Sequence, residues 1–117
     1  MARKVGNYGE DLAADFLQKK GYQIMHRQYR TRFAEIDIIA RHGEYIVFIE
    51  VKYRRNLLFG YPRESVGPVK QRKIKQCALM FMAIELRKEQ DFRFDVIDIV
   101  DDSADGTFNI THIENAF

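Results

Sequence analysis

The stretch 33–54, FAEIDIIARHGEYIVFIEVKYR, decides the fold of this chain. Two runs rich in β-branched and aromatic residues, 33–40 and 45–53, flank a short polar segment that contains a glycine. This pattern is typical of two antiparallel strands joined by a compact turn. We place the two-residue turn at His42-Gly43, so that opposing positions in the two strands have residue numbers that sum to 85.

That register predicts where the charged residues of the hairpin lie. Glu35 then faces Glu50, and Asp37 lies diagonal to Glu50 on the same face. Lys52 follows Glu50 by two residues, so its side chain points to this face as well. Side chains of diagonal neighbours can converge. The hairpin therefore predicts three carboxylates and a lysine gathered on one face of an otherwise apolar sheet.

Two explanations fit such a cluster. Burying like charges together costs free energy unless a cation offsets them. A divalent ion such as magnesium or manganese suits carboxylate oxygens, and Lys52 would then hold or activate a water. The alternative is a salt-bridged hairpin, in which Lys52 and an arginine neutralise the carboxylates. Ion-pair networks resemble active sites, so the charges alone leave both explanations open.

The elements around the hairpin alternate between helices and strands. An amphipathic pattern predicts a first helix that ends at Gly21, and Pro68 is well placed as the first residue of a long helix. The predicted elements are a helix at 8–20, strands at 22–31, 33–40 and 45–53, a loop at 54–67, a helix from 68 to about 88, and strands at 91–100 and 107–113. This order predicts an α/β fold with an αβββαβ core and a mixed central sheet flanked by helices.

Length and composition limit the class of protein. A chain of 117 residues with 46% apolar and 31% charged residues is expected to form one domain, 1–117, and not a disordered segment. The only cysteine, Cys77, cannot form an internal disulfide, which suits a reducing compartment. No apolar run reaches the ~20 residues of a membrane span, and the charged residues 1–6 are not followed by the apolar core that a secretory signal needs. We therefore expect a cytoplasmic protein that does not bind membranes.

The first helix adds a further acidic candidate. At about 100° per residue, Leu12, Phe16 and Leu17 form one apolar arc, and Glu10 falls inside this arc. An acid on a buried face needs a partner. Glu10 is either part of a site or a glutamate stabilised by the positive end of its helix.

The charge is unevenly distributed along the chain. Residues 52–75 carry eight basic side chains against Glu64 alone, a net charge of +7, whereas residues 76–117 have a net charge of −6. A basic block with Tyr53 between its charges is typical of a phosphate-binding surface. It is equally typical of an ordinary solvated face.

These residues carry a resemblance to a known family. The sequence resembles the PD-(D/E)XK nuclease superfamily, because Asp37 is followed after twelve residues by Glu50-Val51-Lys52 and the first helix carries an acid. The chain is more closely similar to the YraN-like (UPF0102) family, which has a restriction-endonuclease-like core of the Holliday-junction-resolvase type. The matching positions are Gly9-Glu10, Gly21-Tyr22, Glu35 to Ala40, Phe48 to Arg54, Phe59-Gly60, Lys70, Lys73 and Arg93-Phe94-Asp95. Ala34 and Gln28 depart from the family, which usually has glycine and asparagine there.

The resemblance implies metal-dependent hydrolysis of nucleic-acid phosphodiester bonds, in DNA ahead of RNA and on branched or structured substrates. It implies that Asp37, Glu50 and the Val51 carbonyl hold Mg²⁺ or Mn²⁺, and that Glu10 binds a metal ion or its water from the side of the first helix. Lys52 would orient the attacking water and stabilise the charge on the phosphoryl group. Phosphate contacts would come from the basic block, through Arg54, Arg55, Lys70 and Lys73. The role of Glu35 stays open.

Two other functions remain open from the sequence. One is a nuclease-fold protein that binds nucleic acid without cutting it. The other is a self-associating module, because residues 77–84 are apolar at every angle around the helix axis. Burial in the protein's own core explains such a helix, and so does a homodimer through the helix at 68–88.

Overall fold

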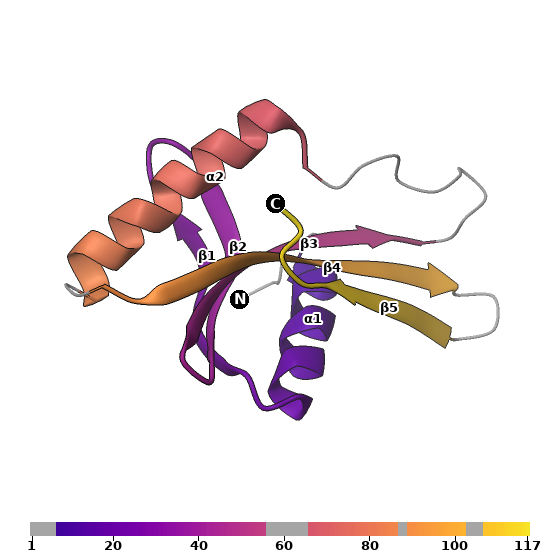
Figure 1. The fold of residues 1–117 in the computed structure, drawn as a ribbon. Coiled ribbons are helices and arrows are strands. Elements are labelled where there is room, and N and C mark those ends of the chain that lie inside the picture. Colours follow the sequence, from indigo (N-terminus) through magenta and orange to yellow (C-terminus); the bar gives the residue numbers. More distant parts are fainter. Residues whose placement is uncertain (1–6, 56–65, 87–88, 103–106) are drawn as a thin grey trace, which may run out of the picture.

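The structure is a computed structural model that describes residues 7–55, 66–86, 89–102 and 107–117. One five-stranded sheet, in the order β1-β2-β3-β4-β5, lies between two helices (Figure 1). The elements are α1 (Asn7–Lys19), β1 (Gln23–Arg30), β2 (Glu35–His42), β3 (Tyr45–Arg54), α2 (Pro68–Phe81), η1 (Met82–Leu86), β4 (Asp91–Asp102) and β5 (Thr107–Ile113).

The sheet is mixed, as the sequence predicted. Strands β1, β2 and β3 form an antiparallel meander, β4 runs parallel to β3, and β5 is antiparallel to β4. Parallel neighbours require a crossover connection, and α2 lies within the segment that connects β3 to β4. The predicted αβββαβ order is confirmed, and the architecture is consistent with a restriction-endonuclease-like core.

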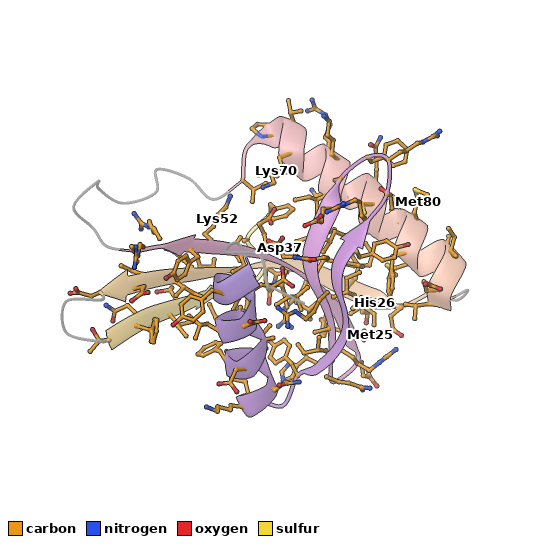
Figure 2. All side chains as sticks on the ribbon, turned by 180° about the vertical axis from the view of Figure 1, so that it is seen from behind. Met25, His26, Asp37, Lys52, Lys70 and Met80 are labelled. Atoms are coloured by element: carbon orange, nitrogen blue, oxygen red, sulfur yellow. The ribbon has the colours of Figure 1, made fainter. Side chains whose placement is uncertain are left out.

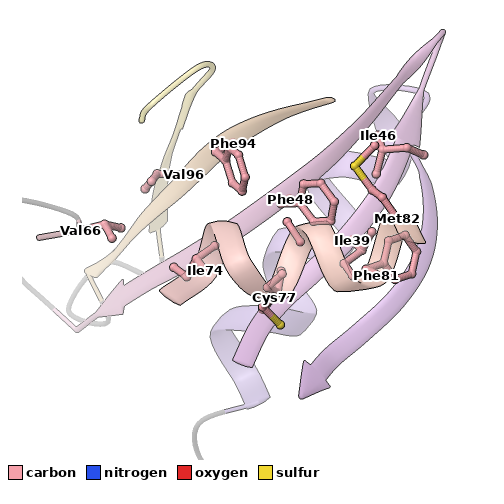
Figure 3. Close-up of a cluster of buried hydrophobic side chains, with 12 residues drawn as sticks. Ile39, Ile46, Phe48, Val66, Ile74, Cys77, Phe81, Met82, Phe94 and Val96 are labelled. Atoms are coloured by element: carbon pink, nitrogen blue, oxygen red, sulfur yellow. The ribbon is translucent and has the colours of Figure 1, made fainter. Parts of the chain in front are cut away.

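Each face of the sheet carries its own apolar cluster, because successive strand residues point to opposite faces. Phe48 packs on the α2 face together with Phe81 and Phe94 (Figure 3). Ile49, its neighbour in β3, packs on the opposite face with Leu17 of α1. The two clusters fix β3 between both helices, so the residues at its carboxyl end lie beside the amino ends of α1 and α2.

Most predicted boundaries agree with the structure, and one helix differs. Gly21, with a φ of +91°, follows the end of α1 in the left-handed conformation expected there. The long helix predicted to reach residue 88 is α-helical only to Phe81 and continues as the π-helix η1 to Leu86. Residues 87–88 and most of the loop at 54–67 lie outside the described residues. Within the described ranges, no helix has the length and apolar character to cross a bilayer.

Gly9 allows α1 to approach β3 closely. A Cβ atom at this position would lie 2.6 Å from the Cβ of Tyr53, which is too short for any real contact. We expect Gly9→Ala to lower the free energy of unfolding by about 1–3 kcal/mol, measured by urea denaturation. Gly67→Ala is the control, because a Cβ there meets nothing within 4 Å. A loss at Gly67 as large as the loss at Gly9 would contradict this packing argument.

Candidate functional site

Asp37 and Glu50 meet across the β2–β3 hairpin, but in a register that differs from the predicted one. His42 pairs with Tyr45 and Ile38 pairs with Ile49, so opposing residue numbers sum to 87. The predicted register, with a sum of 85, is wrong. Extending the observed register by one position places Asp37 directly opposite Glu50, and not diagonal to it.

The turn explains this shift. The two turn residues are Gly43 and Glu44, and Gly43 has a φ of +61°. Hairpin turns of two residues need a positive φ at their first central position, where glycine is favoured. The observed turn puts Gly43 at that position, whereas the predicted turn put His42 there.

Glu35 does not join the other carboxylates, and its predicted position opposite Glu50 is wrong. It begins β2 and pairs with Arg30 of β1, whose Nε donates a hydrogen bond of 2.8 Å to Glu35 Oε2. This ion pair at the outer side of the hairpin accounts for the charge of Glu35. The predicted cluster of three carboxylates therefore reduces to the pair formed by Asp37 and Glu50.

Glu50 is a buried acid that forms an ion pair with a lysine of α2. Its side chain is 7% exposed, and the Nζ of Lys70 lies 3.0 Å from Oε2. This contact is an ion pair, and Oε2 has no hydrogen bond of good geometry from any described residue. Oε2 of Glu50 is therefore buried from solvent without a complete set of hydrogen bonds.

Asp37 is half-buried and faces that acid. The backbone N–H of Val51 donates a hydrogen bond of 2.8 Å to Asp37 Oδ2. Burial and the hydrogen bond and charge of Glu50 raise the pKa of Asp37 to about 8, against the opposing effect of the Val51 N–H. The pair therefore resists carrying two negative charges unless a cation joins it.

This pKa predicts an unusual pH dependence of stability. An unfolded aspartate has a pKa of about 3.9, so between about pH 4 and pH 8 the folded protein holds a proton that the unfolded chain has released. The free energy of unfolding should fall as the pH rises through this window. Without divalent ions, we expect Asp37→Asn to exceed the wild type by about 1–3 kcal/mol at pH 8, measured by urea denaturation. Asp15→Asn, an exposed change on α1, should leave the pH profile unaltered.

Lys52 and Lys70 bring positive charge to the same place from different elements. Figure 2 shows both side chains reaching toward one region near Asp37, Lys52 from β3 and Lys70 from α2. Burial and the charge of Lys70 lower the pKa of Lys52, although the charges of Glu50 and Asp37 oppose the change. The two ammonium groups therefore lie near each other as well as near the carboxylates.

Glu10 is buried, as its position in the apolar arc predicted, and its partner is Arg27. The Arg27 Nε donates a hydrogen bond of 2.8 Å to Glu10 Oε1, and Glu10 is 5% exposed. The charge of Glu10 also contributes to the raised pKa of Asp37, which places Glu10 near the pair. The sequence does not single out Arg27, because its position depends on a bulge in β1 between Ile24 and His26.

The four residues predicted to contact phosphate differ in exposure and in their ion-pair partners. Lys73 and Arg55 are exposed, whereas Arg54 is half-buried with its Nη2 3.9 Å from Asp98 Oδ2. Lys70 is half exposed and contacts Glu50. Of these four predicted phosphate contacts, two side chains therefore face solvent, one lies near Asp98 and one contacts the acid of the site.

The donor set at the site fits a hard divalent ion. Across the described ranges, no three His, Cys, Asp or Glu side chains gather closely enough to enclose a metal ion. Magnesium does not require such an enclosure, since it keeps several waters and binds through one or two carboxylates. Asp37, Glu50 with its incompletely coordinated Oε2, and the Val51 carbonyl match that requirement.

Fold and site together define an α/β protein of restriction-endonuclease-like architecture with a carboxylate pair and two lysines at the end of its central hairpin. The chain belongs to the Uncharacterised protein family UPF0102, whose family model matches residues 9–99. It is 50% identical over 118 residues to a UPF0102 protein of Thermodesulfovibrio yellowstonii, covering 100% of this chain and 99% of the relative. A UPF0102 protein of Caldicellulosiruptor saccharolyticus is 44% identical over 115 residues, 98% of each chain.

Proposed function

We propose that this protein is a divalent-metal-dependent nuclease that hydrolyses phosphodiester bonds in the cytoplasm, with branched or structured DNA as its substrate class. The observation that supports this proposal is the pair Asp37 and Glu50, level with each other across β2 and β3, with Lys52 beside them. Apolar strands have no structural need for two facing acids, and this arrangement raises the pKa of Asp37 to about 8.

Each residue of the site has a role in this reaction. Asp37, Glu50 and the Val51 carbonyl would hold Mg²⁺ or Mn²⁺. A bound ion of this kind polarises a phosphoryl oxygen and makes its bound water more acidic. The Lys52 ammonium stabilises the negative charge that develops on the phosphoryl group and orients the water. Glu10, held by Arg27, adds negative charge at the side of the site that faces α1.

Nucleic acid would reach the site along the basic residues that follow it. Arg55 and Lys73 are exposed and supply phosphate contacts that are independent of sequence. Arg54 and Lys70 lie closer to the carboxylates. These contacts position a backbone without reading its bases, which agrees with recognition of a DNA shape.

Manganese binding tests the metal site directly. We expect calorimetry to detect Mn²⁺ binding to the wild type and at least tenfold weaker binding to Glu50→Gln, because the variant loses one of two anionic ligands. Glu35→Gln is the matched control, since Glu35 binds Arg30 and does not contribute to the site formed by Asp37 and Glu50. Equal affinity of the wild type and Glu50→Gln would remove Glu50 from the site.

Cleavage assays test the reaction. A panel of labelled junction, flap, single-stranded and duplex DNA, with the matching RNA, is incubated with magnesium, manganese or a chelator. Cleavage that the chelator abolishes supports the proposal. Binding without product on every substrate would instead favour a nuclease-fold protein that binds nucleic acid without cutting it.

A second candidate function is self-association through α2. The helix buries Cys77 and Phe81 in the protein's own core, but Val69 and Leu79 remain 56% and 58% exposed. Exposed aliphatic side chains on one helix suit a homodimer contact. Light scattering of the wild type and Leu79→Glu tests this function, and a monomeric wild type would exclude it at the concentration used.

A further inference from the structure

Lys70 occupies an electrostatically unfavourable position in its helix. It lies in the first turn of α2, where the helix macrodipole favours acids and disfavours cations, and that turn contains no acid. The contact that offsets this cost is the ion pair of 3.0 Å with Glu50. Lys70 therefore binds the acid that the proposed function assigns to the metal.

A divalent ion at this site would be repelled by the two lysine ammonium groups already there. Asp37 and Glu50 together carry at most two negative charges, and Lys52 and Lys70 carry two positive ones when protonated. With both lysines protonated, a divalent ion would leave a surplus of at least +2 in a partly buried site, which repulsion between the cations opposes. The surplus falls when one ammonium group moves into solvent.

Lys70 is the cation that can leave. Its side chain is 51% exposed and reaches Glu50 from outside the sheet, whereas Lys52 is half-buried on β3. Glu50 Oε2, the oxygen that contacts Lys70, also lacks a well-formed hydrogen bond from the described residues. An incoming metal ion and Lys70 would thus compete for one oxygen atom.

We propose that Lys70 is an internal counter-cation of this site, displaced from Glu50 by the metal and transferred to a phosphate of the nucleic acid. This inference rests on the proposed function, because it assigns Glu50 to the metal. Without metal, Lys70 neutralises Glu50 and adds little to the affinity for nucleic acid. With metal, the freed ammonium adds one phosphate contact, so metal binding and nucleic-acid binding reinforce each other.

The first experiment measures competition without any cleavage. Mn²⁺ is titrated by calorimetry into the wild type, Lys70→Met and Lys75→Met, the last being an exposed lysine further along the same helix. We expect Lys70→Met to bind Mn²⁺ about threefold to tenfold more tightly than the wild type, since the competing cation is gone. Lys75→Met should stay within about twofold. Unchanged or weaker binding by Lys70→Met would overturn the inference.

The second experiment separates displacement from a general effect of charge. Affinity for a labelled four-way DNA junction is measured against salt concentration with and without Mn²⁺, and the DNA is checked for cleavage afterwards. If the junction is cut, the comparison is made in proteins that also carry Lys52→Met, so that the DNA stays intact during the measurement. The salt slope should grow by about one unit with Mn²⁺ when Lys70 is present and stay constant in Lys70→Met. The same slope with and without Mn²⁺ in the protein that retains Lys70 would overturn the transfer.

Mn²⁺ binding by the variants distinguishes the counter-cation role of Lys70 from the metal site itself. Loss of Mn²⁺ binding in Glu50→Gln, together with an unchanged affinity in Lys70→Met, would overturn the counter-cation role and leave the metal site intact. Absence of Mn²⁺ binding in the wild type would overturn both the metal site and the role of Lys70.

Discussion

Replacing Lys52 with methionine is expected to reduce the single-turnover cleavage rate by about 10²–10³-fold. Lys52 lies beside Asp37 and Glu50, so in the proposed reaction its ammonium would act on the charge that develops on the phosphoryl group in the transition state. An interaction made mainly in the transition state lowers the rate far more than it lowers ground-state affinity. Methionine retains much of the length and apolar stem of lysine, so the fold should tolerate the change.

The rate and the affinity should be measured on the same labelled substrate. Lys75→Met is the matched control, because it removes one positive charge from α2 at an exposed position. We expect its cleavage rate to stay within about twofold of the wild type. Undiminished cleavage by Lys52→Met would exclude the mechanism assigned to the site, whatever the oligomeric state.

Replacing Asp95 with alanine is expected to cost about 3–5 kcal/mol of stability. Asp95 is fully buried in β4 and accepts hydrogen bonds from Arg93 Nε at 3.0 Å, His112 Nε2 at 2.7 Å and the Asn115 N–H at 3.1 Å. Burial alone would raise the pKa of Asp95, but the hydrogen bonds from His112 and Arg93 lower it below its ordinary value. Removing the acid leaves the Arg93 guanidinium, only 9% exposed, without its buried counter-ion.

Urea denaturation at pH 7 measures this effect. Asp91→Ala is the control, since Asp91 is an exposed acid at the start of the same strand and its loss should change stability by less than about 0.5 kcal/mol. Because the folded pKa of Asp95 is depressed, its contribution is present above pH 4 and disappears as the pH falls below that value. A loss at Asp95 no larger than that at Asp91 would contradict the role of this network.

The sequence predicted the elements well because their signals are local. The strand at 107–113 has the predicted bounds, and the helix at 8–20 differs from α1 by one residue at each end. Glu10 was predicted to be buried from the helical period alone, and it is. The register of the hairpin was predicted wrongly, because turns at His42-Gly43 and at Gly43-Glu44 differ by only one position in each strand, and the second puts glycine at the first central position.

The partners of the site residues could not be predicted, because they come from segments distant in the sequence. Arg27 reaches Glu10 from β1, and Lys70 reaches Glu50 from α2. The backbone of β1 adds a further irregularity, since Gln28 has a φ of +54°. Asparagine adopts such a conformation more readily than glutamine.

The hairpin that carries the site has a consequence for folding kinetics. Asp37 and Glu50 are only 13 residues apart in the chain and meet through the β2–β3 turn, whereas the parallel pairing of β3 with β4 must wait for the crossover that contains α2. Local hairpins close early because their loop entropy is small. We therefore expect the two carboxylates to meet before the Lys70 ammonium reaches Glu50. The pair is then expected to add to the barrier to folding, and this contribution to grow as the pair loses its proton.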